Sequence, residues 1–353
     1  MEKVLRVGII GAGGIARGAH IPNYLKCGDK VQIVAVSDVV IEKAEELAKD
    51  FNIPYAFSSY EDMLEEVEID AVSICTPNKF HYPATIAALK AGCHVLCEKP
   101  PAMAVEEAEE MAALAEKIGK MLTYGFHFRH SPHVDTLKRF IDAGELGNIY
   151  AAQVTAMRRR GIPGWGVFTN KELQGGGPLI DIGVHMLDTA LYLMGYPEPD
   201  TVLGVTYQEI GNRKGVGLLG TWDWDNFSVE DMARGMITFK NGASILLETA
   251  FAANVEKHDE MNVKLMGDQG GASVFPLKIY QEKHETLIDI TPSHLPKEDF
   301  HEIELGRFVD SCLNGSEPIS TPQQGVYLQQ IINGLYESAE KGEAIKIIQK
   351  SLV

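Results

Sequence analysis

Residues 4–16 read Val4-Leu5-Arg6-Val7-Gly8-Ile9-Ile10-Gly11-Ala12-Gly13-Gly14-Ile15-Ala16. The segment from Val4 to Ile10 is largely β-branched and apolar on both faces, as expected for a strand buried within a parallel sheet. The turn after it fits the pattern Gly-x-Gly-x-x-Gly/Ala. In this pattern Gly11 permits the tight turn, Gly13 lets the backbone approach a pyrophosphate, and Ala16 allows close helix–strand packing. With Gly14 and Ile15, the turn opens a helix whose free N–H groups favour an anion.

A second apolar strand, Val31–Ser37, ends at Asp38. A carboxylate at this position is placed to bind the 2′-hydroxyl of an adenosine ribose. A glycine turn alone is also compatible with a plain structural bend, but strand, turn, helix and acid together predict a dinucleotide site. Asp38 would repel a 2′-phosphate, and Val39-Val40 offers no arginine to receive one. We therefore expect NAD rather than NADP.

Strands and helices continue to alternate through the first third of the chain, which predicts an α/β fold with a doubly wound parallel sheet over residues 1–123. The strands are expected at Ala71–Cys75, His94–Cys97 and Met121–Tyr124, and the helices at Glu42–Phe51, Ala84–Lys90 and Val105–Ile118.

The pattern changes after residue 123, where longer strands follow one another with few helices. Residues 124–353 are predicted to form an α+β domain on an open, mostly antiparallel sheet, with Asn241-Gly242 as a hairpin turn. The expected strands are Ile149–Met157, Val202–Gln208, Met232–Phe239, Ala243–Ala250 and Val263–Met266, and only Pro178–Met194, Glu304–Asn314 and Pro322–Glu340 are expected to be helical.

Composition excludes several classes of protein. The chain has 353 residues with 32 Lys+Arg and 49 Asp+Glu, a formal net charge of −17, which disfavours binding to nucleic acid or to an anionic membrane. No apolar run approaches the ~20 residues of a membrane span. The N-terminus lacks the pattern of a signal peptide, and the five scattered cysteines fit reduced thiols, so we expect a cytoplasmic protein. Cys93-His94-x-x-Cys97 lacks a second ligand pair, so we expect no metal.

Three further motifs carry residues with catalytic chemistry. Thr76-Pro77-Asn78-x-x-His81 and Glu98-Lys99-Pro100 each follow a predicted strand, at the carboxyl edge where doubly wound sheets bind ligands. Gly175-Gly176-Gly177 precedes Asp181 and His185, which are four residues apart and therefore share one helix face. The same spacing could hold a metal ion, but no third ligand is evident.

With these motifs the sequence resembles the Gfo/Idh/MocA family of oxidoreductases along essentially its whole length. The resemblance implies a Rossmann domain followed by an open-faced sheet domain, the latter used for dimer or tetramer assembly. It also implies that Lys99, Asp181 and His185 line a substrate pocket beside the nicotinamide. Thr76, Pro77, Asn78 and His81 match the family's nicotinamide-side loop, with a plain strand-to-helix cap as the alternative. The family suggests a cis Lys99–Pro100 bond.

The chemistry of these side chains agrees with that expectation. A neutral imidazole has the pKa range of a general base, so His185 is the candidate for removing a hydroxyl proton. Lys99 can stabilise the developing alkoxide or relay the proton, and Asp181 can position the substrate or the base. Taken alone, His185 would more often be a buried structural histidine. Glu98 is expected to position Lys99 or the ribose.

Some positions bear on the substrate rather than the reaction. Gly125-Phe126-His127-Phe128-Arg129 departs from the family pattern Gly-Phe-Asn-x-Arg, because His127 replaces an asparagine that would face the substrate. Arg158-Arg159-Arg160 leads into a loop containing Trp165. Three arginines commonly form a solvated charge run, but loops of this kind also carry binding groups, so Arg158 and Trp165 are expected to line the pocket with His127 and Arg129.

The function expected from the sequence is hydride transfer between NAD and a secondary hydroxyl of a sugar, cyclitol or sugar derivative. Two alternatives stay open at this point. One is an NAD-dependent glycosidase of the same fold, which would release sugar without net NADH. The other is a non-catalytic NAD- or sugar-sensing regulator, which would not need Lys99, Asp181 and His185 together. A homodimer or homotetramer through the second sheet is also expected.

Overall fold

The computed structural model describes residues 4–318 and 320–348. By spatial compactness the chain divides into two units, Met1–His130 with Glu298–Val326, and Ser131–Lys297 with Tyr327–Val353. Residues 298–326 therefore lie with the first unit, although they are distant from it in sequence. The sequence pattern predicts a single division after residue 123. It carries no signal that residues near the C-terminus belong to the first unit.

The first unit contains a six-stranded parallel sheet in the order β3-β2-β1-β4-β5-β6. This order, with the first strand at the centre, is that of a dinucleotide-binding doubly wound fold. The prediction of the fold class is confirmed. The strands are β1 (Leu5–Ile10), β2 (Val31–Ser37), β3 (Tyr55–Phe57), β4 (Ala71–Ile74), β5 (His94–Cys97) and β6 (Leu122–Tyr124).

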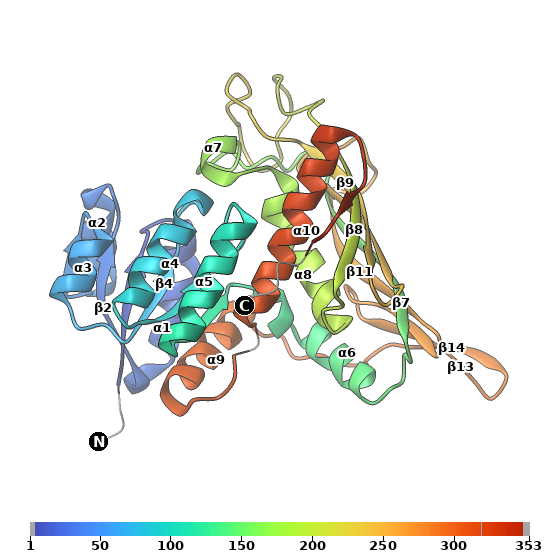
Figure 1. Ribbon diagram of the computed structural model, residues 1–353, viewed down its shortest axis with the longest axis horizontal. Coiled ribbons are helices and arrows are strands. Elements are labelled where there is room, and N and C mark those ends of the chain that lie inside the picture. The colour runs from blue at the N-terminus through green and yellow to red at the C-terminus, as the bar shows by residue number, and fades with distance from the viewer. Residues whose placement is uncertain (1–3, 319, 349–353) are drawn as a thin grey trace. The chain divides into compact units, whose positions relative to one another are not determined.

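Helices cover this sheet, and one of them comes from the distant segment (Figure 1). Leu305, Phe308 and Val309 of helix α9 are buried in the same core as Val7 and Ile9 of β1. The helical segments of the unit are η1 (Ala16–His20), α1 (Ile21–Lys26), η2 (Gly28–Lys30), α2 (Ile41–Phe51), α3 (Tyr60–Glu66), η3 (Asn78–Phe80), α4 (His81–Lys90), α5 (Val105–Ile118), η4 (His127–His130) and α9 (Phe300–Asn314).

The second unit is built on a nine-stranded sheet in the order β14-β13-β12-β11-β7-β10-β9-β8-β15. Among the strand pairs of the described residues in this sheet, only β7–β10 is parallel, so the prediction of a mostly antiparallel sheet is confirmed, as is the hairpin between β9 and β10. The strands are β7 (Ile149–Arg158), β8 (Pro199–Tyr207), β9 (Met232–Phe239), β10 (Ser244–Ala250), β11 (Asp259–Gly267), β12 (Gly270–Ser273), β13 (Lys278–Lys283), β14 (Thr286–Ile290) and β15 (Ile345–Lys346).

The prediction of only three helical segments after residue 123 is wrong. Helix α6 follows Ser131, whose side chain accepts a hydrogen bond from the His133 N–H, and Pro132 occupies the first turn. Ser before Pro is a start signal that the sequence did contain. The helical segments of the second unit are α6 (Pro132–Asp142), α7 (Lys171–Gln174), η5 (Leu179–Gly183), α8 (Val184–Leu193) and α10 (Pro322–Lys341), of which α10 begins in the first unit.

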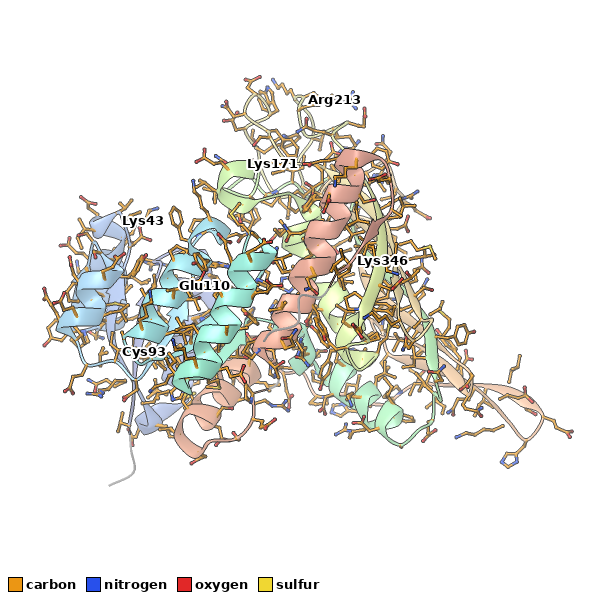
Figure 2. The ribbon with its side chains drawn as sticks, in the orientation of Figure 1. Lys43, Cys93, Glu110, Lys171, Arg213 and Lys346 are labelled. Carbon is orange, nitrogen blue, oxygen red and sulfur yellow. The ribbon has the colours of Figure 1, made fainter. Side chains whose placement is uncertain are left out.

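The helices present charged side chains to solvent. Lys43 of α2 and Glu110 of α5 are both exposed (Figure 2). Within residues 4–318 and 320–348, no helix combines the length and the apolar character needed to cross a membrane.

Candidate functional site

The glycine turn after β1 has the geometry that its sequence predicts. Gly11 has a φ of +98°, and a Cβ at this residue would lie 2.6 Å from the Cys75 carbonyl oxygen, so only glycine fits. Gly13 is less confined, since a Cβ there would meet only the Cys75 oxygen at 3.9 Å, and one at Gly14 would meet no described atom within 4 Å. Ile15 caps the helical turn η1 without a side-chain hydrogen bond. Open glycine backbone at the start of a helix is suited to a phosphate group.

Asp38 lies at the carboxyl end of β2 and is linked to this turn. Its Oδ2 accepts a hydrogen bond from the Ala12 N–H at 2.9 Å, and its Oδ1 accepts one from the Val40 N–H at 3.0 Å. A carboxylate has about four lone-pair sites, so these two bonds leave capacity for a ribose hydroxyl. The structure thus brings Asp38 and the glycine turn together, and ribose binding itself stays a prediction.

The loop after β4 is joined to the loop after β5 by His81. This buried imidazole lies between two carbonyl oxygens, with Nδ1 2.8 Å from Pro100 and Nε2 3.0 Å from Thr76. Burial lowers the pKa of His81, although both carbonyl groups raise it. Pro77 and Asn78 occupy the bend between the strand and α4, with Asn78 buried. These predicted residues therefore gather at one edge of the sheet, and the Lys99–Pro100 bond there is cis, as expected.

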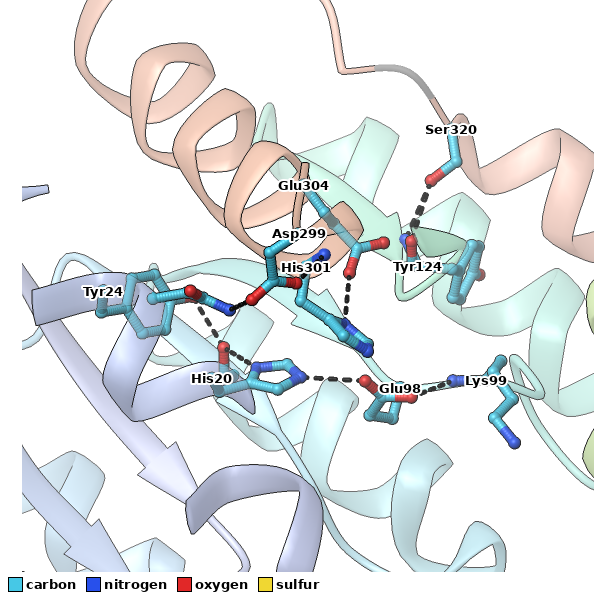
Figure 3. A network of polar contacts seen from close by, with 11 residues as sticks. His20, Tyr24, Glu98, Lys99, Tyr124, Asp299, His301, Glu304 and Ser320 are labelled. Carbon is cyan, nitrogen blue, oxygen red and sulfur yellow. Dashed lines mark hydrogen bonds and ion pairs between the residues drawn. The ribbon is translucent and has the colours of Figure 1, made fainter. Parts of the chain in front are cut away.

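Glu98 is the centre of a buried polar network (Figure 3). Its Oε1 lies 2.9 Å from His20 Nε2, and its Oε2 accepts a hydrogen bond from the Lys99 backbone N–H at 3.3 Å. Burial alone would raise the pKa of Glu98, but His20 and then Lys99 lower it to about 2. This hydrogen bond ties the Glu98 carboxylate to the Lys99 main chain, and the expectation that Glu98 positions Lys99 or the ribose stays a prediction. The sequence does not predict a role for His20, since nothing in the spacing relates it to Glu98.

His127 and Arg129 lie in the short helical turn η4 of the same unit. The His127 ring stacks on His301, with ring centroids 4.1 Å apart, and burial together with the His301 charge lowers the pKa of His127 well below its ordinary value. Arg129 is only 1% exposed. Its guanidinium donates to Gln324 Oε1 at 2.7 Å and lies over the Phe126 ring. Arg129 therefore makes its described contacts with protein groups, and its role in substrate binding stays a prediction.

In the second unit, the glycine run before Asp181 is shaped around a buried carboxylate. Glu230 accepts hydrogen bonds from the Gly177 N–H at 2.9 Å, the Leu179 N–H at 3.2 Å and the Tyr336 hydroxyl at 2.9 Å. A Cβ at Gly176 would lie 2.0 Å from the Tyr336 hydroxyl oxygen. Burial raises the pKa of Glu230 against these hydrogen bonds. Close packing against Glu230 and Tyr336 therefore requires glycine in this run. The sequence does not predict the role of Glu230.

Asp181 and His185 follow this run on consecutive helical segments. Asp181 lies in the π-helical turn η5, and His185 lies in the first turn of α8. π-Helical turns widen a helix locally and are frequent at functional sites. The Thr249 hydroxyl of β10 donates to the Pro178 carbonyl at 3.0 Å, which ties this segment to the sheet. Asp181 is half-buried and His185 is buried, and their catalytic roles stay predictions.

The arginine-rich segment begins at Arg158, the last residue of β7, in the same unit. Arg158 lies 3.5 Å from Asp259 through its Nε, and Arg160 donates to the Ala253 carbonyl at 3.0 Å. Trp165 is 56% exposed and meets Phe168 edge to face, with ring centroids 6.5 Å apart. Arg158 thus has a protein partner, whereas Trp165 presents most of its ring to solvent. Whether they contact substrate stays a prediction.

Cys93 and Cys97, the pair weighed as a zinc site, are both buried, and burial raises the pKa of the Cys93 thiol to about 11. The five cysteines all lie in the described chain and form no disulfide there. Among the described residues, no three His, Cys, Asp or Glu side chains are grouped to hold a metal ion.

Comparison with known proteins relates both units to one group of enzymes. Residues 5–126 match the GFO_IDH_MocA description "Oxidoreductase family, NAD-binding Rossmann fold". Residues 138–347 match "Oxidoreductase family, C-terminal alpha/beta domain". The two matches together cover most of the chain.

Individual relatives are similar over the same length. D-glucoside 3-dehydrogenase of Escherichia coli K12 is 43% identical over 97% of this chain and 97% of its own. The scyllo-inositol 2-dehydrogenase (NAD(+)) of Bacillus subtilis 168 is 28% identical over 91% of this chain and 90% of its own. A solved levoglucosan dehydrogenase in complex with NADH superimposes with a TM-score of 0.85 over 99% of this chain and the whole of the other, at 23% identity, which shows the shared fold.

Proposed function

Since the chain belongs to the Gfo/Idh/MocA family of NAD-binding oxidoreductases, we propose that it oxidises a secondary hydroxyl of a sugar with NAD as hydride acceptor. In this reaction the alcohol becomes a ketone, the carbinol hydride reduces NAD, and one proton is released. The observation that carries the proposal is the placement of Lys99. It follows β5 in the unit that contains the glycine turn, and its main chain is fixed by Glu98.

Different residues of the chain have different roles in this reaction. Gly11, Gly13, Gly14 and Ile15 receive the pyrophosphate, and Asp38 receives the adenosine ribose. The loop that carries Thr76, with His81 at the start of α4, holds the nicotinamide side. NAD, when bound, supplies the acceptor for the hydride. His185 takes the hydroxyl proton, Lys99 stabilises negative charge on the substrate oxygen, and Asp181 orients the sugar or the base.

D-glucosides are the substrate class with the best support. The relative named D-glucoside 3-dehydrogenase is 43% identical over nearly the whole chain. We propose oxidation at C3 of a D-glucoside. Trp165 offers an apolar face to a sugar ring, with Arg158 and His127 supplying polar contacts. If so, Trp165→Ala and Arg158→Ala raise KM for the glucoside, and an unchanged KM in both would remove them from the pocket.

A substrate panel tests the proposal. Methyl D-glucosides, free sugars and inositols are each incubated with NAD or NADP, and reduced cofactor is followed by absorbance. The expected result is NADH formation with a glucoside and a slower reaction with NADP. Release of free sugar without net NADH would instead identify the glycosidase alternative. Binding of NAD and sugar with neither product would identify a sensor.

We further propose that the second sheet joins copies of this chain. Leu203, Met236 and Leu246 lie directly opposite one another on β8, β9 and β10, and all three are substantially exposed. With Val205 they line a groove of about 440 Å³ on the open face of the sheet, which the Arg234–Glu248 ion pair borders. A contiguous apolar patch of this kind is suited to an identical face on a second copy.

A further inference from the structure

His20 links three separate elements of the first unit (Figure 3). It ends the helical turn η1, which begins at the glycine turn, and its ring is fully buried. Nδ1 lies 3.0 Å from the hydroxyl of Ser73 on β4, and Nε2 lies 2.9 Å from Glu98 Oε1 after β5. Both ring nitrogens are therefore engaged with groups that lie more than 50 residues further along the chain.

Glu98 is held just as firmly on its other sides. Oε2 accepts the Lys99 backbone N–H at 3.3 Å. A Cβ at Gly125 would lie 2.9 Å from Glu98 Oε1 and 3.1 Å from Oε2. The carboxylate therefore packs directly against the main chain of residue 125, and only glycine leaves room for this contact. The Gly125 N–H in turn donates to the Cys97 carbonyl at 2.8 Å. The carboxylate is thus packed between β5, the end of β6 and the His20 ring.

The charges of this pair depend on each other. A buried carboxylate without a cation is costly. The groups that face the His20–Glu98 pair are Tyr24 from α1, Ser73 of β4, Cys75 directly after β4, Lys99 after β5, and His301 and Glu304 from α9. Burial lowers the pKa of His20, yet Cys75 and Glu98 raise it well above 6.5. An imidazolium that donates from both nitrogens matches the two acceptors that the structure provides.

We propose that His20 is a positioning residue for the reaction: its imidazolium fixes the Glu98 carboxylate, and Glu98 fixes the main chain from which Lys99 reaches the substrate. The inference rests on the role of Lys99 in the proposed function. It also places the segment that receives the pyrophosphate and the segment that carries the lysine on one hydrogen-bonded network.

The test compares four variants in the full-length protein. His20→Gln removes the cation, and Glu98→Ala removes the acceptor for the Lys99 N–H. We expect each to lower kcat on the order of 10²-fold, as a misplacement of about 1 Å can, while the Kd for NADH changes little. Glu98→Gln should recover part of the kcat lost in Glu98→Ala, because its amide oxygen can accept the Lys99 N–H and its NH₂ can donate to a neutral His20. Tyr24→Phe, which removes only the outer bond to Ser73, is the matched control with unchanged kcat.

Measurement of unfolding against pH needs no substrate and separates this proposal from the function. The pKa of His20 is raised in the folded protein. Its contribution to the free energy of unfolding is therefore present below about pH 6.5 and is lost as the pH rises through the folded pKa. The pKa of Glu98 is lowered in the folded protein. Its contribution to the free energy of unfolding is therefore present above about pH 4.5 and is lost as the pH falls toward about 2. Glu98→Gln should abolish the acidic slope and weaken the slope above pH 6.5, because Cys75 also raises the pKa of His20.

The outcomes are distinguishable. If wild-type protein oxidises no sugar but shows both slopes, the proposed function fails and the ion pair stands. Equal kcat values for Glu98→Ala and Glu98→Gln, or full activity in His20→Gln, would overturn the positioning role. Should His20→Gln fail to fold, the comparison of the two Glu98 variants decides alone.

Discussion

The two candidate catalytic side chains are carried by different kinds of backbone. Lys99 lies in a loop whose main chain is held by Glu98, and His185 lies in the first turn of a helix tied to the sheet through Pro178. Each side chain therefore starts from a fixed main-chain position. Such preorganisation is what general acid–base chemistry requires, because the reacting atoms must lie within hydrogen-bond reach of the base.

Replacing these two residues should lower turnover rather than binding. For Lys99→Ala and His185→Ala we expect kcat on the glucoside to fall by about 10²–10⁴-fold, the range contributed by a general acid or base. NADH binding should persist, because neither residue belongs to the glycine turn. Steady-state kinetics with fluorescence titration of NADH provides the check. Retained turnover in both variants would remove them from the reaction.

Asp38 sets the choice of cofactor in this account. Asp38→Asn keeps an acceptor for the Ala12 N–H but removes the charge that repels a 2′-phosphate. The ratio of kcat/KM for NADP to that for NAD should rise on the order of tenfold, since charges a few ångströms apart near a surface interact by about 1–4 kcal/mol. Asp29→Asn, at an exposed aspartate elsewhere in the unit, is the control and should leave the ratio unchanged. An unaltered ratio in Asp38→Asn would contradict the assignment.

At the scale of elements, the glycine run before η5 shows how packing decides a local structure. Gly177 donates to Glu230 Oε2, and a Cβ at residue 177 would lie 2.2 Å from the Glu230 carbonyl oxygen. The buried carboxylate and the close backbone approach leave no space for a side chain. The segment that carries Asp181 therefore depends on Glu230, 53 residues later in the chain.

Gly177→Ala should accordingly destabilise the protein. We expect the free energy of unfolding to fall by about 1–3 kcal/mol, the usual cost of overpacking a filled site. Gly306→Ala, in the middle of α9 where a Cβ would meet nothing within 4 Å, should instead raise it by up to about 1 kcal/mol. Denaturant unfolding of both variants tests the difference. Similar changes of the same sign would show that the Glu230 contact does not govern this segment.

The sequence predicts long elements well, because periodicity and glycine patterns act over neighbouring residues. Helix α5 and strands β2, β5 and β9 begin and end where expected. Strand β3 and helix α3 were not predicted. For β3 the reason is that Tyr55–Phe57 is short and partly exposed, and so has no strong apolar pattern. Helix α6 was missed although its Ser131-Pro132 start was readable.

The candidate site divides in the same way. Asp38, Glu98 and Lys99 could be identified because each follows a predicted strand, and strand ends gather at one sheet edge. His20 and Glu230 could not, because their partners are set by tertiary packing across more than 50 residues. Glu98 was expected to position Lys99 or the ribose, and the structure adds that a buried imidazole supports it.

At the scale of the whole molecule, the exposed face of the second sheet leads to a prediction about assembly. Leu246→Lys places a charge in the apolar patch formed with Leu203 and Met236, directly opposite Met236, where burial without a partner costs several kcal/mol. We expect the variant to be monomeric at concentrations at which the wild-type protein is a dimer or tetramer, measured by light scattering after gel filtration.

A surface leucine in the same sheet provides the control. Leu287 of β14 is more exposed than Leu246, and Leu287→Lys should leave the assembly intact. A monomeric wild-type protein would contradict the proposal, and so would equal dissociation by both substitutions.

The whole account depends on a direct transfer of hydrogen from sugar to cofactor. The most direct test uses methyl D-glucoside carrying deuterium at C3, incubated with NAD and the wild-type protein. We predict that the deuterium is recovered at C4 of the reduced nicotinamide and that the rate shows a primary isotope effect. Deuterium retained in the sugar, or exchanged into water with no labelled NADH, would contradict the account.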